Sequence, residues 1–305
     1  MKPVIAVVGP TASGKTRRAV ELARALGTEI ISADSRQVYR GMTLGTGKDL
    51  DEYGDVPYHL IDIADAGGKY NLHRFVRDYE AAERDMRGRG LQPLLCGGSG
   101  MYVETVLAGI RLPEVPENKE LRESLSGKTL AELTDILASM KRLHNTTDVD
   151  TCARAIRAIE IETYYADNPE AARNSRRETA TPRPSVIIGI DIDRDIRRQR
   201  ISSRLDQRLR NGMVEEVRRL LDSGIPAEDL IYYGLEYKFV TEYLIGRRTY
   251  QDMRDGLEIA IHQFAKRQMT WFRGMERRGF KINWLAYDLP AEAFLAQALS
   301  LIRNS

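Results

Sequence analysis

The sequence lacks the features that mark a membrane, disulfide-stabilised or zinc-binding protein. Its 305 residues contain only two cysteines, Cys96 and Cys152, and four histidines with no paired spacing. Two cysteines cannot form a disulfide framework, and we expect both to be core or partly buried thiols in a reducing compartment. No apolar run reaches the roughly 20 residues of a membrane span, and the first residues show no signal-peptide pattern. These absences predict a cytoplasmic protein that does not enter a membrane.

Aromatic residues are also few, at 7%, but hydrophobic residues make up 42% of the chain, which is enough for a full core. The net charge is only +2. Its distribution is uneven, because residues 170–219 hold 13 arginines and no lysine against 8 acidic residues. Such a stretch is typical either of a solvated, salt-bridged helix pair or of a surface that binds polyphosphate or nucleic acid.

A phosphate-binding loop (P-loop) reads GPTASGKT at residues 9–16, directly after an apolar run that predicts a buried strand. A glycine-rich turn between a strand and a helix directs backbone N–H groups and the positive end of the helix dipole at one point. Lys15 adds a mobile charge, and the Thr16 hydroxyl suits a Mg²⁺ ion. We therefore expect phosphate binding by the whole loop, Gly9, Pro10, Thr11, Ala12, Ser13, Gly14, Lys15 and Thr16.

Strand-like and helix-like segments alternate through the first hundred residues. This alternation predicts an α/β fold with a parallel sheet flanked by helices and with ligands at the carboxyl ends of the strands. The P-loop, residues 34–39 and residues 97–102 should meet at that edge. The strand-like segments are residues 29–31, 58–63 and 92–96, and a helix is expected at 72–89.

A proline-bearing stretch at 112–118 interrupts the alternation and indicates an inserted subdomain. We predict a first part of the core at residues 1–112, a small helical insertion at 113–147, and completion of the core with C-terminal helices for nucleic-acid binding at 148–305. Further along, the patterns predict a helix at 150–164, a core strand at 185–191, helices at 194–222, 236–245 and 250–277, and a strand near 281–287.

Asp34 is the acidic candidate beside the P-loop. A carboxylate at the end of a strand can hold Mg²⁺ through water, act as a general base, or simply close a turn. Ser35 and Gln37, which follow it, carry hydrogen-bonding groups suited to the edge of a base. Ser99 presents a hydroxyl among three glycines, although an ordinary strand-to-helix turn would also explain those glycines.

Seven segments resemble the tRNA dimethylallyltransferase family, in the same order and over nearly the whole chain. They are residues 9–16, 34–39, 45–48, 59–62, 97–102, 157–160 and 265–273. The resemblance implies a P-loop NTPase-like fold whose loop holds the diphosphate of dimethylallyl diphosphate. It also implies that an adenosine next to the anticodon of tRNA is flipped into a channel, where its exocyclic amine attacks the prenyl group and diphosphate leaves.

The resemblance further implies roles for single residues. Asp34 would accept the proton of the adenine amine, Lys15 and Ser99 would act with it in catalysis, and Mg²⁺ would bind at Thr16. Arg204 and Arg208 would clamp the diphosphate, unless they belong to a solvated helix face. The partner would be the tRNA anticodon stem-loop, contacted by Asp34, Ser35, Arg36, Gln37, Arg122, Arg154, Lys266 and Arg267. Trp271 and Phe272, on the same amphipathic helix, are interpreted as core residues.

Three departures from the family pattern, at residues 234–238, 261–262 and 150–154, all fall on the tRNA side and none on the diphosphate side. Because of these departures, a free adenine nucleotide stays possible as the acceptor in place of tRNA. A P-loop kinase or NTPase and an RNA-binding protein without catalysis also stay open, and the intact Lys15 and Asp34 argue against the last. We expect a monomer.

Overall fold

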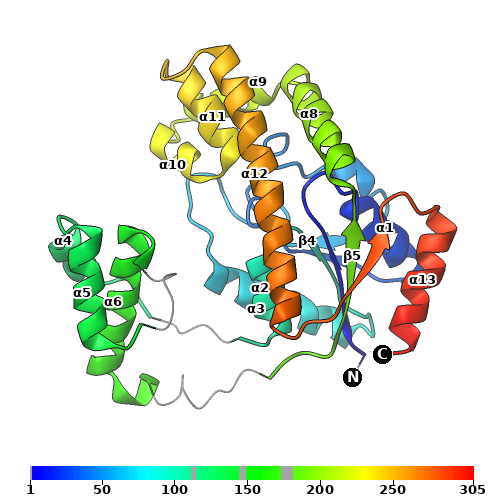
Figure 1. Ribbon diagram of the computed structural model, residues 1–305, viewed down its shortest axis with the longest axis horizontal. Helices are drawn as coiled ribbons and strands as arrows, with labels where there is room; N and C mark the ends of the chain where they lie inside the picture. The colour runs from blue at the N-terminus through cyan, green and yellow to red at the C-terminus, as the bar shows by residue number, and fades with distance from the viewer. Residues whose placement is uncertain (1, 111–114, 144–148, 173–180) are drawn as a thin grey trace. The chain divides into compact units, whose positions relative to one another are not determined.

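A computed structural model of the chain describes residues 2–110, 115–143, 149–172 and 181–305 (Figure 1). The chain forms two compact units, one made of residues 1–109 and 181–305 and the other of residues 110–180. The second unit is longer than the expected insertion at 113–147 and reaches residue 180. Each unit is described separately below.

The first unit is built on a six-stranded sheet with the strand order β3-β2-β4-β1-β5-β6. All neighbouring strands are parallel. The strands are β1 (Val4–Val8), β2 (Ile30–Ser32), β3 (Tyr58–His59), β4 (Leu94–Gly97), β5 (Ser185–Asp191) and β6 (Ile282–Ala286). Because β1, β2 and β4 are fully buried, their continuous apolar sequence belongs to a sheet covered on both faces. The predicted parallel α/β sheet is confirmed.

Strand β3 is much shorter than the strand predicted at residues 58–63. Leu60 and Asp62 adopt left-handed backbone conformations, with φ of 63° and 55°, and therefore cannot continue an extended strand. Asp62 instead forms an ion pair with Lys48, whose buried ammonium also donates to the carbonyl of Tyr39 at 2.6 Å. A tertiary contact has thus replaced the local strand preference.

Helices cover both faces of the sheet (Figure 1). Helices α1 (Lys15–Leu26) and α13 (Ala291–Arg303) pack against each other on one face. Helix α3 (Gly100–Leu107) packs on the other, flanked by α2 (Leu72–Gly88) and α12 (Tyr250–Arg277). The core between the first helix pair and the sheet includes Ile5, Leu22, Leu94, Ile188 and Phe294.

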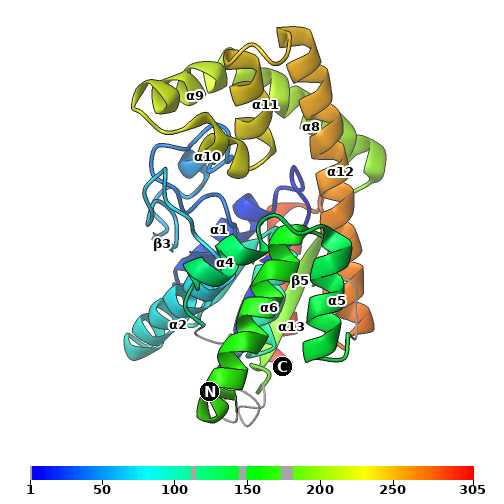
Figure 2. The same ribbon diagram turned by 90° about the vertical axis from the view of Figure 1, so that its left-hand side faces the viewer.

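A group of helices lies beyond the carboxyl ends of the strands (Figure 2). It contains α8 (Arg194–Arg210), α9 (Met213–Asp222), α10 (Ala227–Tyr232) and α11 (Leu235–Leu244) together with the first half of α12, and the short helix η1 (Leu50–Glu52) precedes β3. The single helix predicted at 194–222 is two helices, because Gly212 has a φ of 98° and ends the helical path.

The second unit contains α4 (Lys119–Leu125), α5 (Leu130–Met140) and α6 (Cys152–Asp167) around a small core of Leu133, Leu137 and Ile159. Because α6 packs on α4 and α5, it belongs to this unit rather than to the core part expected from residue 148. The proline at 113 lies outside the described residues.

The two cysteines differ in exposure. Cys96 is buried on β4, as expected. Cys152 is exposed at the start of α6, so the expectation of a buried or partly buried thiol is wrong there.

In the described ranges, no helix combines the length and hydropathy needed to cross a membrane.

The close approach of β2 and β4 gives a first test. A Cβ at Gly97 would overlap the backbone of Ala33, and we expect Gly97→Ala to destabilise the fold by about 1–3 kcal/mol through overpacking. Gly88→Ala is the matched control, because a Cβ at this helical position meets no atom within 4 Å and should be neutral or slightly stabilising. Urea unfolding midpoints measure both effects, and equal midpoints for the two variants would contradict the prediction.

Candidate active site

The P-loop turns tightly between β1 and α1. The Ser13 N–H donates to the Pro10 carbonyl at 3.3 Å, and Gly14 takes a left-handed conformation with a φ of 84°. Ala12 is also left-handed, with a φ of 61°, a conformation that costs free energy for a residue with a side chain. Such strain is typical of a loop shaped for a ligand rather than for stability.

Gln268 on α12 connects the P-loop to the neighbouring strand end. Its Oε1 accepts the Thr11 N–H at 2.8 Å, and its Nε2 donates to the Gly98 carbonyl at 2.8 Å. The side chain is buried, so both halves of the amide are used within the protein. From the sequence, Gln268 could be placed only on a basic helix. Its contact with the P-loop could not be predicted, because Thr11 lies 257 residues away in the chain.

Asp34 and Ser99 meet at the carboxyl ends of the adjacent strands β2 and β4. The Arg36 N–H donates to Asp34 Oδ1 at 2.9 Å, which is the turn-closing role. No hydrogen bond reaches Asp34 Oδ2 from the described part of the chain. The Ser99 hydroxyl accepts the Ser35 N–H at 3.1 Å and so fixes this turn against β4. One carboxylate oxygen therefore shapes the turn and the other is available to a ligand.

A cavity of about 290 Å³ brings most of the expected site residues together. It lies between the P-loop, the turns after β2 and β4, and helices α8, α11 and α12. The expected residues that line it are Thr11, Lys15, Thr16, Asp34, Ser35, Arg36, Gln37, Ser99, Arg204, Arg208 and Arg267. Of the other P-loop residues, Ala12 and Gly14 line a neighbouring cavity, whereas Gly9, Pro10 and Ser13 line neither.

The neighbouring cavity has a volume of about 590 Å³ and shares Lys15, Thr16, Arg204 and Arg208 with the first. Four cationic or hydroxyl groups therefore form a common boundary between two spaces. A ligand with an anionic group in its middle could bind these four residues and extend into both cavities, with its reacting end in one of them. The larger cavity also carries Asp49 and Glu52.

Burial perturbs the cations at this boundary. It lowers the pKa of Lys15, although the nearby charge of Asp34 partly opposes the shift. Burial and the adjacent charge of Arg208 lower the pKa of Arg204 to about 9. Partly desolvated cations gain from an anionic ligand, because it replaces the solvation that they have lost. The boundary is therefore electrostatically suited to a diphosphate.

Asp49 lies between the two arginines and forms ion pairs with both Arg204 and Arg208. Arg208 reaches this position across Gly47, where the φ of 65° favours glycine and any Cβ would overlap the guanidinium. Gly47 thus leaves room for the Arg208 guanidinium to reach the cavity. A purely solvated helix face does not describe these two arginines, because both line the cavities and form ion pairs with Asp49.

Oxygen donors near Thr16 fit Mg²⁺ better than a softer metal. In the described ranges, no group of three or more histidine, cysteine or acidic residues could hold a metal ion without other ligands. Mg²⁺ usually keeps several waters and takes one or two protein oxygens together with substrate phosphates. Thr16 lines both cavities, with Asp34 in the lining of one and Asp49 in the lining of the other, so such a shared site is compatible with the residues present.

The remaining expected RNA-binding residues lie outside the cavity. Lys266 is exposed on α12 next to Arg267. Arg122 and Arg154 belong to the second unit, where Arg122 pairs with Glu160 and Arg154 with Asp150. Phe272 is buried as expected, but Trp271 is 40% exposed and is not a core residue. The helical pattern did not separate these two neighbours.

Several cavity residues were not assigned to the site from the sequence. Tyr233, Gly234, Leu235 and Glu236 come from the junction of α10 and α11, and Ile261 and Phe264 come from α12. Burial raises the pKa of Glu236, which faces Arg208. The sequence marked residues 234–238 only as a departure from a family pattern. No residue near them shows the spacing of a catalytic motif.

Comparison with protein families gives two matches. The IPP transferase model matches residues 37–275, and the isopentenyl transferase model matches residues 2–53. A protein of Bacteroides fragilis named tRNA dimethylallyltransferase 2 is 61% identical over 293 residues, which cover 95% of this chain and 94% of that protein. A tRNA dimethylallyltransferase 1 of Geotalea daltonii is 51% identical over 99% of this chain and 95% of its own length.

Solved structures agree with these matches. A tRNA isopentenylpyrophosphate transferase of Bacillus halodurans has a TM-score of 0.72 at 30% identity and covers 100% of this chain and 98% of its own. A eukaryotic dimethylallyltransferase acting on tRNA has a TM-score of 0.82 and shares the fold at 22% identity, over 100% of this chain and 79% of its own. Two family models and near full-length relatives agree, and the chain belongs to the IPP transferase family of tRNA dimethylallyltransferases.

Proposed function

We propose that the chain transfers a dimethylallyl group from dimethylallyl diphosphate to the exocyclic amine of the adenosine next to the anticodon in tRNA. Diphosphate is the second product. The observation that carries this proposal is the single cavity in which the P-loop, the Asp34 carboxylate and Arg267 of the basic helix meet. A family of prenyltransferases supplies the reaction class, and this cavity supplies the groups that the reaction needs.

The P-loop side stabilises the leaving group. Breaking the bond between the allylic carbon and the diphosphate oxygen leaves additional negative charge on the diphosphate. Lys15, Arg204 and Arg208 line both cavities on this side, and together with backbone N–H groups of the loop they would stabilise that charge. No phosphoryl group is transferred, so the loop acts by binding and by electrostatic stabilisation alone.

The turns after β2 and β4 act on the acceptor. The amine nitrogen forms the new bond to the prenyl carbon and must then lose a proton. Asp34 lines the cavity and would accept that proton on Oδ2, while its Oδ1 is held by the Arg36 N–H. Ser35 and Gln37, on the same turn, supply hydrogen-bonding groups for the edge of the base.

Mg²⁺ belongs to this proposal as a partner of the diphosphate. It would be held by the Thr16 hydroxyl together with diphosphate oxygens and would neutralise part of the leaving-group charge. The tRNA anticodon stem-loop as the partner, the cytoplasm as the compartment and a monomer as the working form are parts of the same proposal.

A labelling experiment tests the proposed function. The purified chain is incubated with Mg²⁺, labelled dimethylallyl diphosphate and either unmodified tRNA or AMP. Label on tRNA supports the proposal, and label on AMP alone would favour the free nucleotide as acceptor. Release of phosphate from ATP without prenyl transfer would favour an NTPase instead. Label on neither acceptor overturns the proposed transferase.

Asp34→Asn separates the general base from the shape of the turn. The amide oxygen keeps the hydrogen bond to the Arg36 N–H but cannot accept the proton, so we expect the transfer rate to fall roughly 10²–10⁴-fold. Affinity for inorganic diphosphate should stay nearly unchanged. Asp51→Asn, the same change at an exposed residue of η1, is the control and should leave the rate unaltered. Full activity of Asp34→Asn would exclude the general-base role.

Thr16→Ala tests the metal ligand. Loss of the hydroxyl should raise the Mg²⁺ concentration for half-maximal transfer on the order of tenfold or more. Thr16→Ser keeps the hydroxyl and should restore the Mg²⁺ dependence of the unmodified chain. The measurement is a Mg²⁺ titration of the transfer rate at fixed donor concentration. Identical titrations for the Ala and Ser variants would show that Thr16 does not hold the metal.

Gln268→Ala tests the link between α12 and the P-loop. It leaves the Thr11 N–H and the Gly98 carbonyl without partners, at a cost of about 1–3 kcal/mol for each group that stays unsatisfied. We expect a lower melting temperature and weaker binding of inorganic diphosphate. Gln251→Ala, on an exposed position of the same helix, should change neither property. Calorimetry measures both, and unchanged diphosphate binding in Gln268→Ala would contradict the link.

A further inference from the structure

A strongly basic groove runs between the first half of α8 and the second half of α12, two helices that lie side by side in Figures 1 and 2. Its volume is about 450 Å³, and it lies outside the cavity of the proposed reaction. Arg194, Arg197 and Arg198 come from α8, and Lys266 and Arg273 from α12. One carboxylate, Asp191, also lines it.

These five cations lack the partners that other arginines of the same helices have. Within the described ranges, none of them forms an ion pair with a carboxylate. Near the other ends of the two helices, Arg254 on α12 pairs with Asp206 on α8 at 2.9 Å and with Glu258 at 3.0 Å. The helix pair therefore neutralises its charges at one end and leaves cations together at the other.

The grouping of like charges has a cost. Burial lowers the pKa of Arg197, and the neighbouring charges of Arg194 and Arg273 lower it further. Asp193 lies close in sequence, but its carboxylate caps α8 by accepting the N–H groups of Asp195 and Ile196. Uncompensated cations from two different helices on one groove indicate a surface that is completed by an anion.

The groove is continuous with the reaction site along α12. It shares Gln263, Lys266 and Thr270 with a second, open groove of about 740 Å³ on the adjacent face of the helix. That second groove carries Arg267, which also lines the reaction cavity, and the exposed Trp271. Arg267 and Lys266 therefore supply cations that connect the linings of the reaction cavity, the open groove and the basic groove.

We propose that the groove of Arg194, Arg197, Arg198, Lys266 and Arg273 binds backbone phosphates of the acceptor RNA, beyond the nucleotide that enters the reaction cavity. This inference rests on the proposed function for the identity of the RNA. Arginine predominates in the groove, and its planar guanidinium suits phosphate oxygens. The exposed Trp271 beside the path offers a face for base stacking. A free phosphate or diphosphate is the other source of the same ligand chemistry.

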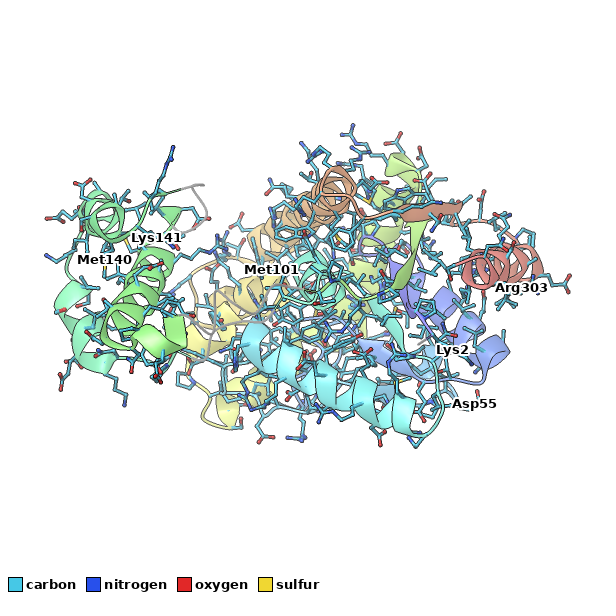
Figure 3. All side chains as sticks on the ribbon, turned by 90° about the horizontal axis from the view of Figure 1, so that it is seen from below. Lys2, Asp55, Met101, Met140, Lys141 and Arg303 are labelled. Carbon is cyan, nitrogen blue, oxygen red and sulfur yellow. The ribbon has the colours of Figure 1, made fainter. Side chains whose placement is uncertain are left out.

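The test removes three cations from both sides of the groove. The triple variant Arg194→Gln/Arg197→Gln/Arg273→Gln is compared with Arg77→Gln/Arg84→Gln/Arg303→Gln, which removes the same charge from exposed positions of α2 and α13. Arg303 is labelled on α13 in Figure 3. Binding of unmodified tRNA is measured between about 50 and 200 mM salt, together with the melting temperature of each variant.

We expect the groove variant to bind tRNA more weakly and to flatten the slope of log K against log salt by about 2–3, because each lost phosphate contact removes roughly 0.7–0.9. The control variant should keep the slope of the unmodified chain, and both variants should melt as folded proteins. Equal slopes for the two variants would overturn the proposal. A groove variant that does not fold is replaced by the single variants, each expected to change the slope by about 1.

Two further arms separate RNA binding from binding of a free anion and from the proposed function. Inorganic diphosphate is titrated onto both variants, and an unchanged tRNA slope with a selective loss of a diphosphate site would assign the groove to a free anion and overturn RNA binding. Prenyl transfer by the unmodified chain is measured in parallel. If the unmodified chain shows no prenyl transfer but the groove variant flattens the salt slope of tRNA binding, only the proposed function is contradicted. If prenyl transfer occurs but the groove variant keeps the salt slope of the unmodified chain, only RNA binding by the groove is contradicted.

Discussion

The side-chain amide of Gln268 is the contact on which the site depends most. The P-loop follows β1 and the Gly98 turn follows β4, and these two strands are neighbours in the sheet. Parallel pairing fixes the ends of the strands but not the loops beyond them. By accepting from Thr11 and donating to Gly98, Gln268 holds both loops to α12. The adjacent residue Arg267 therefore has a defined position in the cavity, and the helix that carries the basic surface is tied directly to the P-loop.

A second constraint acts on the opposite wall of the cavity. Glu216 on α9 is buried and accepts the N–H groups of Thr43, Leu44 and Gly45, and the hydroxyl of Tyr237 donates to the same carboxylate at 2.5 Å. One carboxylate thus fixes the segment that leads to Gly47, across which Arg208 reaches the site. Buried carboxylates are costly unless fully hydrogen-bonded, and this one has four donors. Its hydrogen bonds give Glu216 a structural role, whereas within the described residues Asp34 accepts a single hydrogen bond, from the Arg36 N–H.

Local patterns predicted the parts of the fold that local forces decide. The P-loop, the buried strands and the long helix α12 follow from glycine placement, apolar runs and helical periodicity, and the meeting of the three loops follows from the parallel sheet. The length of β3 could not be predicted, because it ends where Asp62 turns to reach Lys48. The assignment of α6 to the second unit depends on its packing against α5, and the exposure of Trp271 depends on which side of α12 meets the sheet. None of these contacts is local in sequence.

The cavity also changes the interpretation of the sequence departures. From the sequence, the departure at residues 234–238 affects only the contacts with RNA. In the structure, Gly234, Leu235 and Glu236 line the same cavity as Arg204 and Arg208, and burial raises the pKa of Glu236 against the opposing effect of the Arg208 charge. A carboxylate beside Arg204 and Arg208 weakens the attraction of these arginines for an anion unless the carboxylate is neutral or turned toward a donor. The nearby charge of Asp34 raises the pKa of Glu236 in the same direction as burial, so both work against the charged form of this carboxylate.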